Sequence, residues 1–406
     1  MIFQRLTKIT FLAKPVNVYY IDVLDGLRAI SVLFIAWFHF WQQSWLSPSL
    51  NLGSYQIDLL FIPRSGYIFV DVLILLSGFC LFLPHARHML MGADYPSTSG
   101  FYLKRALRIL PSYWLCLFVV LFFFTLPNNE YNGNNDEMWK DLLSHLSFTQ
   151  TFWPETYSGT HLNVVLWTLA IEVQFYLIFP LLAKIFTKQP IPVYFLMVMT
   201  AQAFRFIIIQ PRTDIGLLIN QLPNFLDVYA NGMLGALAFI KLAQAYNESN
   251  KKSWIAFLGT LLTLISAYIA IFMMQDLSYV ASYEKINAWQ SNNRFAWSIV
   301  ILMFILSSAF SMPWLRWLLS NKLVAFISFI SYNFFIWHQY LAVQMKKFHF
   351  PASVNENPHI AAEYSWQILY MLIAFSLATI VGTILTYGFE KPVAENLSQW
   401  FKAKKI

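Results

Sequence analysis

Long apolar runs separated by short polar segments make up most of the chain. A helix needs roughly 20 predominantly apolar residues to cross a bilayer. Ten runs meet that criterion, at residues 21–44, 66–84, 109–127, 164–186, 191–210, 223–243, 254–274, 294–312, 323–345 and 365–389. This pattern predicts an all-α integral membrane protein, a bundle of about ten transmembrane helices. Because ten is even, both termini are expected on the same side.

The charges of the connecting segments predict which side that is. Lys and Arg are concentrated in the N-terminal segment, the even-numbered loops and the C-terminal tail. The odd-numbered loops contain fewer, and the longest of them, 128–163, is acidic and rich in Asn. Since cytoplasmic segments carry the excess of Lys and Arg, both termini are expected in the cytoplasm.

The segments between the apolar runs predict no separate domain. Residues 1–20 combine basic residues with short apolar stretches and lack a cleavage site, which is typical of an interfacial lead-in. In the extracytoplasmic loop 128–163, apolar residues from Trp139 to Phe148 recur at helical spacing, which predicts an amphipathic helix. No linker interrupts the chain, so we expect one membrane domain over residues 1–406 with no fused soluble domain.

The first apolar run, IDVLDGLRAISVLFIAWFHFWQQS, contains three ionisable residues. Asp25 and Arg28 are three residues apart and can pair on one side of a helix. His39 follows Arg28 by eleven residues, which places it within roughly 20° of the same helix face and about 16 Å further along the axis. His39 has no local partner, so it must contact another helix or face a cavity. Ionisable groups inside a membrane are costly and indicate function.

More ionisable residues are expected in the outer half of the membrane, where the predicted topology also places His39. They are Asp71, Glu172, Arg205, Asp227 and His338. Facing lipid at the bilayer centre, each would cost roughly 2.5–3.5 kcal/mol or more, so we expect them to converge on a polar cavity. The alternative is a set of separate interhelical ion pairs, such as Arg205 with Asp227.

A basic cluster is expected at the cytoplasmic surface. In FYLKRALRILPSYW, Lys104, Arg105 and Arg108 lie on one face of a short helix before the third run. They could bind phosphate groups or simply set the topology. In LLSGFCLF, Ser77 and Gly78 fall in mid-membrane, where small residues permit either close helix packing or passage of a ligand.

Composition excludes several other classes of protein. The chain of 406 residues is 58% hydrophobic and only 12% charged, unlike a soluble protein of this size. The net charge of +7 does not indicate nucleic-acid binding, because the basic residues lie between apolar runs. Cys80 and Cys116 both fall inside predicted spans, so neither a disulfide framework nor a metal site is expected.

Taken in order, the motifs resemble acyltransferase family 3, the multi-spanning bacterial membrane O-acyltransferases. LDGLRAISVLFIAWFHF resembles the family's first helix, with its basic residue, ten-residue gap and His, here Arg28 and His39. FVDVLILLSGFCLF resembles the second-span motif that ends in Ser-Gly, and FYLKRALRILPSYW resembles the Arg-x-x-Arg element.

Later motifs extend the resemblance to residue 392. LWTLAIEVQFYLIFP resembles the fourth-span pattern that includes Trp167, Glu172 and Tyr176. ISYNFFIWHQYL and TYGFEKPV resemble the late Ser-Tyr…Trp-His motif and the closing Glu-x-Pro. Spans five to eight match mainly in hydropathy.

The resemblance implies transfer of an acyl group, usually acetyl, from acyl-CoA to a hydroxyl of a surface or lipid-linked glycan, in the bacterial inner membrane. It implies acetyl-CoA as a donor substrate and no permanently bound cofactor. The residues expected on the donor side are Lys104, Arg105, Arg108, Ser77 and Gly78. Those expected in supporting or acceptor-side positions are Asp71, Trp167, Tyr176, Arg205, Asp227, Ser331, His338 and Glu390.

The expected catalytic residues are His39, Glu172 and Arg28. A glycan hydroxyl is a poor nucleophile at neutral pH, so its attack on a thioester needs a base, and the imidazole of His39 fits that role. Glu172 would orient and stabilise this imidazole; direct transfer is preferred, with a transient acyl-His39 as a variant. Arg28 would stabilise the oxyanion or bind donor phosphates. The alternative function is a transporter or flippase for a lipid-linked glycan, although no inverted repeat is visible.

Overall fold

The computed structural model describes residues 16–403 except 211, 213, 214 and 281. Most of the lead-in expected over residues 1–20 therefore lies outside the described residues. Within them, ten helical segments are long and apolar enough to cross a membrane, which confirms the predicted all-α bundle. Its long helices are α2 (Val23–Ser44), α4 (Phe69–Met91), α5 (Thr98–Val120), α8 (Trp167–Lys188), α9 (Pro190–Ala203), α10 (Leu226–Glu248), α11 (Lys252–Ser278), α12 (Tyr283–Ala309), α14 (Lys322–Lys347) and α15 (Tyr364–Leu385).

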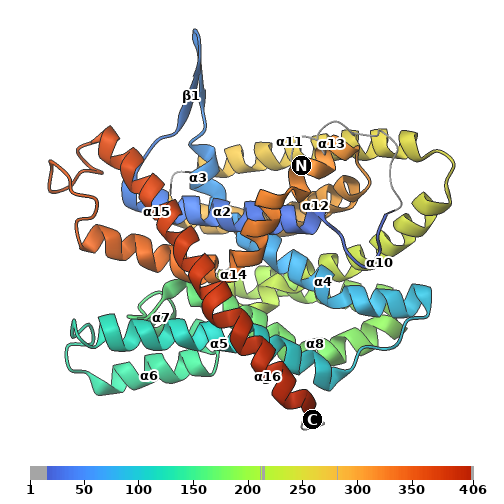
Figure 1. Ribbon diagram of the computed structural model, residues 1–406, viewed down its shortest axis with the longest axis horizontal. Coiled ribbons are helices and arrows are strands. Elements are labelled where there is room, and N and C mark those ends of the chain that lie inside the picture. The colour runs from blue at the N-terminus through green and yellow to red at the C-terminus, as the bar shows by residue number, and fades with distance from the viewer. Residues whose placement is uncertain (1–15, 211, 213–214, 281, 404–406) are drawn as a thin grey trace.

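Short elements connect or extend these helices. The short α-helices are α3 (Phe61–Ser65), α6 (Asn135–Leu146), α7 (Pro154–Tyr157), α13 (Pro313–Ser320) and α16 (Lys391–Ala403). Turns of 3-10 helix are η1 (Gly66–Ile68), η3 (Gln150–Phe152), η4 (Val164–Leu166), η6 (Leu218–Asn220) and η7 (Leu222–Phe225), and π-helical turns are η2 (Leu121–Thr125), η5 (Phe204–Ile209) and η8 (Thr386–Glu390). Figure 1 shows most long helices side by side, with α15 and α16 crossing them obliquely.

The pair α4 and α10 forms the centre of the bundle. The apolar windows of their segments are 78% and 72% buried, against 22% for the segment that contains α9. A Cβ on Gly78 would lie 2.6 Å from the backbone oxygen of Tyr229, and one on Gly232 would clash with the backbone of Leu75. Small residues permit this close helix approach. Of the two readings of Gly78, the structure therefore favours packing.

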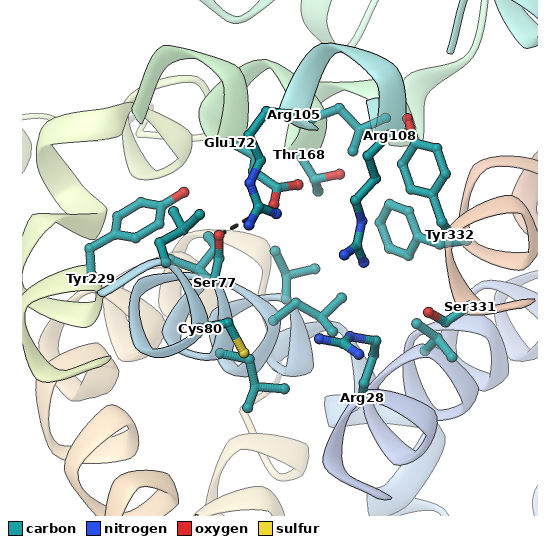
Figure 2. Close-up of a pocket in the computed structure, with 18 residues that line it drawn as sticks. Arg28, Ser77, Cys80, Arg105, Arg108, Thr168, Glu172, Tyr229, Ser331 and Tyr332 are labelled. Carbon is teal, nitrogen blue, oxygen red and sulfur yellow. Dashed lines mark hydrogen bonds between the residues drawn. The ribbon is translucent and has the colours of Figure 1, made fainter. Parts of the chain in front are cut away.

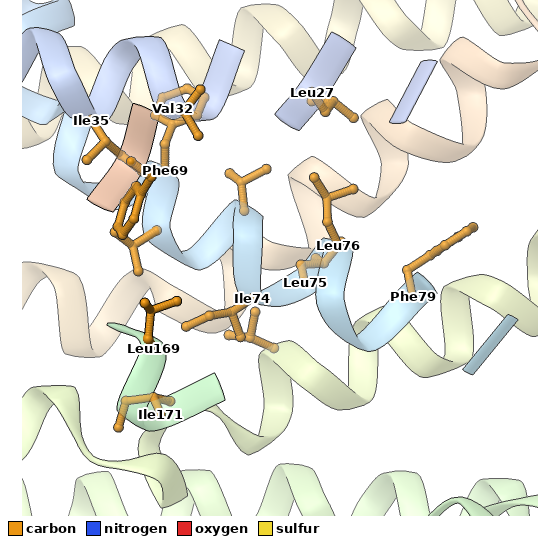
Figure 3. Close-up of a cluster of buried hydrophobic side chains, with 14 of the residues drawn as sticks. Leu27, Val32, Ile35, Phe69, Ile74, Leu75, Leu76, Phe79, Leu169 and Ile171 are labelled. Carbon is orange, nitrogen blue, oxygen red and sulfur yellow. The ribbon is translucent and has the colours of Figure 1, made fainter. Parts of the chain in front are cut away.

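Buried side chains from α2, α4 and α8 pack on this central pair. Figure 3 shows Val32 and Ile35 of α2 near Phe69 of α4, with Leu169 and Ile171 contributed by α8. By contrast, α9, α11 and α15 expose many apolar side chains, including Leu196, Phe272 and Leu372. An exposed apolar surface of this kind is what a bilayer requires of its lipid-facing helices.

Helices α2 and α14 run parallel and are joined at both ends. Near their N-termini, the Ser328 hydroxyl donates to Asp25 Oδ1 at 2.9 Å. Near their C-termini, Lys346 Nζ donates to the Gln43 backbone oxygen at 3.1 Å. The same face of α2 that was expected to hold Arg28 and His39 therefore faces α14.

The loop between α2 and α3 forms a hairpin that the sequence analysis did not predict. Strands β1 (Ser49–Leu52) and β2 (Tyr55–Asp58) pair antiparallel, with Leu52 opposite Tyr55, and both are exposed throughout. Gly53 in the turn has φ +62°, a conformation that glycine adopts without strain. The sequence feature that could have predicted this hairpin is Asn-Leu-Gly-Ser between two short stretches that contain apolar residues, which is typical of a turn.

The amphipathic helix expected in 128–163 is α6. The Asn134 side chain caps it by accepting from the Glu137 backbone N–H. Leu142 is buried, whereas Trp139 and Leu143 are exposed. The loop face, defined here as the face that carries α6, also holds the C-terminal ends of α2 and α14, because Lys347 pairs with Glu130 just before α6.

Candidate active site

A cavity inside the bundle is lined by residues of six helices. Its volume is about 160 Å³. Figure 2 shows polar side chains from α2, α4, α5, α8, α10 and α14 pointing into it. Its polar lining residues are Arg28, Ser77, Cys80, Arg105, Arg108, Thr168, Glu172, Tyr229, Ser331 and Tyr332.

The cavity carries an excess of positive charge. Arg28, Arg105 and Arg108 point toward its centre, and Glu172 is the one carboxylate among the described residues that line it. Among the described residues, Arg105 Nε is buried without a hydrogen-bond partner, although the guanidinium lies 5.5 Å from the Tyr176 ring centroid. Three guanidinium groups face one lining carboxylate, and Asp25, which bonds Arg28 from outside the lining, is a second carboxylate. The remaining positive charge favours an anionic occupant.

Arg28 is held by neighbours on its own helix and on α14. Its Nη1 lies 3.5 Å from Asp25 Oδ1 and 3.4 Å from the Ser328 hydroxyl. The Tyr20 hydroxyl donates to the other carboxylate oxygen of Asp25 at 2.6 Å, and this hydrogen bond raises the pKa of Tyr20 to about 12. Asp25 thus orients the guanidinium while leaving donors free to face the cavity.

Glu172 bonds neighbours inside the cavity. It accepts hydrogen bonds from the Tyr176 hydroxyl, one turn further along α8, and from the Ser77 hydroxyl at 3.3 Å. These contacts fix the carboxylate beside the three guanidinium groups. Ser77 and Tyr176, both predicted from motifs, therefore belong to the same cluster as Glu172.

The basic cluster does not lie on a separate short helix, and two of its three members border the cavity. Helix α5 begins at Thr98, capped by the Ser97 side chain, and continues without a break into the third span. The two arginines, three residues apart, therefore lie on one face of a long helix that borders the cavity. Lys104 is exposed and lies outside the cavity.

His39 lies beyond the cavity, beside His338. The two imidazole centroids are 5.2 Å apart, and His39 Nδ1 lies 3.1 Å from Gln42 Oε1. His338 is fully buried, and its Nδ1 donates to the Phe335 backbone oxygen at 2.6 Å. Its Nε2 has no hydrogen-bond partner in the part of the chain that the structure describes. Since a carbonyl only accepts, the proton of neutral His338 is on Nδ1, and Nε2 keeps its lone pair.

An apolar wall separates this histidine pair from the cavity. Toward the C-termini of α2 and α14, the cavity ends at Val32 and Phe335. His39 follows Val32 by seven residues, about 10 Å along the helix, and His338 follows Phe335 by one turn. The Phe335 ring lies 5.5 Å from the His338 ring. Phe335 therefore stands between the cationic cavity and the imidazoles.

Two expectations about the ionisable residues are corrected by these contacts. The predicted Glu172–His39 contact is not formed: Glu172 bonds Ser77 and Tyr176, whereas His39 bonds Gln42. The six residues also do not share one cavity. Of these six residues, Glu172 is the one found among the described residues that line the cavity.

The alternative of separate ion pairs accounts for three of the six. Arg205 bonds Asp227 through two contacts, of 2.6 and 2.9 Å, and also bonds Asn224. Asp71 bonds Arg294 of α12 at 3.1 Å. Both pairs are buried, so each charge is balanced locally and neither pair needs an aqueous cavity.

The other predicted residues have separate positions. Ser331 lines the cavity, one turn before Phe335. Glu390 ends the π-helical turn η8 and accepts from Asn333 at 2.6 Å. Trp167 packs against Tyr157 and Phe225 near the start of α8.

Three contributing residues were missed by the sequence analysis. Arg294 neutralises Asp71, and Ser328 supports Arg28. Tyr229 lines the cavity, and its buried hydroxyl has no hydrogen-bond partner among the described residues. Arg294 could have been found as an isolated Arg at the start of an apolar run. Ser328 and Tyr229 carry no such signal, because their roles depend on which helices are neighbours.

The fold and the cavity define a multi-pass membrane protein with a cationic site between its helices. The chain belongs to acyltransferase family 3: the family's sequence profile, described as an acyltransferase domain, matches residues 21–388. This match confirms the resemblance found in the motifs.

The chain is also similar to parts of characterised proteins. It is 29% identical over 178 residues to acyltransferase MdmB of Streptomyces mycarofaciens, covering 44% of this chain and 43% of that protein. It is 27% identical over 182 residues to nodulation protein 10 of Rhizobium leguminosarum bv. viciae, covering 40% and 44%. It is 28% identical over 182 residues to O-acetyltransferase OatA of Staphylococcus aureus, covering 42% and 26%.

Each alignment therefore spans less than half of the relative. No solved structure matches the chain.

Proposed function

We propose that the protein is a membrane O-acyltransferase that transfers an acyl group, with acetyl as the proposed group, from acyl-CoA to a hydroxyl of a surface or lipid-linked glycan. The supporting observation is the cationic cavity, because acyl-CoA is an anionic thioester that needs positive charge along its path. The O-acetyltransferase name of one relative supports the acetyl group. The family and the apolar spans support a location in the bacterial inner membrane.

The donor site of this proposal is the cationic cavity. Arg105 and Arg108 bind phosphate oxygens of the donor, and Arg28 lies closer to the apolar wall, where the thioester would pass. Glu172 limits the excess of positive charge and holds Ser77 in place through a hydrogen bond. Acyl-CoA is a substrate here, and the mechanism needs no permanently bound cofactor.

The acyl transfer itself takes place at His39. The imidazole removes the proton of the glycan hydroxyl as its oxygen attacks the thioester carbonyl. The C–S bond then breaks, and the departing thiolate of CoA takes up that proton. His338 packs against His39 and supports its position from α14. For the thioester to reach His39, the Phe335 ring must move aside.

Release of free CoA tests the function directly. Purified protein in lipid nanodiscs is expected to release CoA from acetyl-CoA, slowly to water and faster with an acceptor glycan. The alternative, a transporter or flippase for a lipid-linked glycan, would bind its cargo without consuming the thioester. If correctly folded protein released no CoA with any of a range of glycans, the proposal would be contradicted.

Removing Arg105 or Arg108 is expected to weaken donor binding more than it slows saturated turnover. Phosphate contacts form in both the ground state and the transition state, so their loss raises KM while kcat changes little. A hydrogen bond to a charged group contributes about 1.5–3 kcal/mol, which corresponds to roughly a 10- to 100-fold rise in the donor KM. The measurement is CoA release as a function of acetyl-CoA concentration for Arg105→Ala and Arg108→Ala.

Lys104→Ala is the matched control, since Lys104 is a cation of the same helix whose side chain lies outside the cavity. Its donor KM should stay within about twofold of wild type. Equal effects of all three substitutions would indicate a general surface-charge effect.

Shortening Phe335 is expected to relax the preference for short acyl groups. Phe335→Ala enlarges the apolar end of the cavity, and burial of the two extra methylene groups of butyryl-CoA would contribute about 1.6 kcal/mol, or about tenfold. The measurement is the ratio of kcat/KM for butyryl-CoA to that for acetyl-CoA. Phe329→Ala, an exposed position on the same helix, is the control. An unchanged ratio in Phe335→Ala would show that Phe335 does not limit the acyl group.

A further inference from the structure

A second polar hollow lies on the loop face of the protein. Its volume is about 280 Å³, and it is bounded by η2, residues 128–130, residues 160–164 and the last turns of α14. We name it the α5–α14 groove. Its lining includes the side chains of Asn128, Glu130, Gln339, Tyr340, Gln344 and Lys347.

The charges in this groove are balanced, unlike those in the cationic cavity. Lys347 Nζ lies 2.5 Å from Glu130 Oε1, and His161 Nε2 lies 3.4 Å from Glu137 Oε1. The groove is therefore not built to attract a strongly charged ligand. Its amide side chains both donate and accept hydrogen bonds. Among the described residues, Gln344 Oε1 is buried without a hydrogen-bond partner, which is unfavourable unless a ligand or water donates to it.

A single buried carboxylate holds the walls of the groove together. Asp141 of α6 accepts hydrogen bonds from the Tyr131 hydroxyl at 2.9 Å, the Thr160 hydroxyl at 2.9 Å and the His161 backbone N–H at 3.1 Å. Asn163 ties the same segment to α14 by donating to the Ile336 backbone oxygen at 2.9 Å. The groove is thus preorganised, and α6 braces it.

These features fit a neutral, polyhydroxylated ligand. Sugar hydroxyl groups donate and accept in the same way as the amides that line the groove. The Tyr340 ring, packed edge-on against Phe124, offers an apolar face with a polar tip. A few placed polar groups beside an aromatic surface are typical of a small-molecule site.

The groove lies on the side of α14 opposite the histidine pair. At 100° per residue, Tyr340, Val343, Gln344 and Lys347 are rotated by about 140–240° from His338. A helix is about 10 Å across. A sugar bound in the groove therefore cannot itself present its hydroxyl to His39. A longer stretch of glycan could pass over the end of α14, which lies nine residues, or about 13 Å, beyond His338.

We propose that the α5–α14 groove binds a second sugar unit of the acceptor glycan, several units along the glycan from the one that is acylated. The inference rests on the proposed acyltransferase function and adds to it that the acceptor is an oligosaccharide or a polysaccharide. Gln344 and Tyr340 are binding residues for this second unit. Asp141 is a positioning residue that acts through the segment 160–163.

The test uses acyl esters released by alkali from the cell envelope of the source organism. A gene disruption is complemented with wild type, Gln344→Leu or Tyr340→Ala at equal protein levels. Both variants are expected to lower the ester content at least tenfold, because the acceptor is no longer held. Glu155→Gln, an exposed position on the same face outside the groove, is the control and should restore the wild-type content.

Donor affinity of the purified variants separates acceptor binding from a folding defect. The Kd for acetyl-CoA in nanodiscs should match wild type in both groove variants. Wild-type ester content in the variants would overturn the groove assignment, and so would an equal loss of donor affinity and ester content. If disruption of the gene changes no envelope ester and wild-type protein releases no CoA, the acyltransferase proposal itself fails, which is a different result.

Discussion

Replacement of His39 by alanine is expected to abolish acyl transfer while the protein inserts into the membrane and purifies as wild type does. General-base catalysis contributes roughly 10²- to 10⁴-fold to a rate, and removal of the imidazole leaves the hydroxyl without a base. The side chain contacts Gln42 and His338 and lies outside the tightly packed α4–α10 centre, so its loss should cost little stability. The measurement is acetyl transfer by the purified variant at saturating donor.

Gln42→Ala is an informative comparison, because Gln42 bonds His39 Nδ1 and would only orient the ring. It should lower the rate less than His39→Ala does. Turnover above a few percent of wild type in His39→Ala would show that another group is the base, and His338, with its free Nε2, would be the next residue to test.

The second large effect concerns the two sides of the membrane. The cationic cavity and the histidine pair lie at different depths along α2, with Arg28 and His39 about 16 Å apart. Sealed right-side-out vesicles loaded with acetyl-CoA are therefore expected to acetylate an impermeant glycan added outside. In the proposed mechanism, the donor would enter from the face toward which the N-termini of α2 and α14 point, whereas the acceptor would bind at the loop face.

Unloaded vesicles with acetyl-CoA and glycan both outside are the matched control and should give no product. The quantity measured in both experiments is the amount of acetyl ester on the recovered glycan. Product formed solely when donor and acceptor share the inner compartment would overturn the transfer across the membrane. It would also mean that the loop face is cytoplasmic.

The sequence predicted the spans well, because apolar length alone determines whether a segment can cross a bilayer. The neighbours of each span were harder to predict. Asp71 was recognised as a buried charge, but its partner Arg294 lies 223 residues further along the chain. The sequence analysis gave an Arg205–Asp227 ion pair as the alternative to a shared cavity, and this pair is present. The two residues come from adjacent segments.

The sequence did not show that Arg105 and Arg108 border a cavity, and this has a physical reason. Hydropathy assigns the span to residues 109–127, although α5 already begins at Thr98. Polar residues can occupy the membrane-spanning part of a helix when they face a cavity inside the bundle. Hydropathy averages over all faces of a helix, so it could not distinguish this arrangement from a basic surface loop.

The close approach of α4 and α10 limits how the protein can change shape during turnover. At Gly78 and Gly232, backbone meets backbone, and sliding one helix along the other would force Cα and carbonyl atoms into overlap. Side chains near α2 and α14 can rotate without such overlap. The floor of the proposed donor site is therefore expected to be rigid, and a passage past Phe335 would have to open by rotamer changes and small shifts on the α14 side. A ligand that stiffens α14 at the loop face would thus also govern when the passage opens.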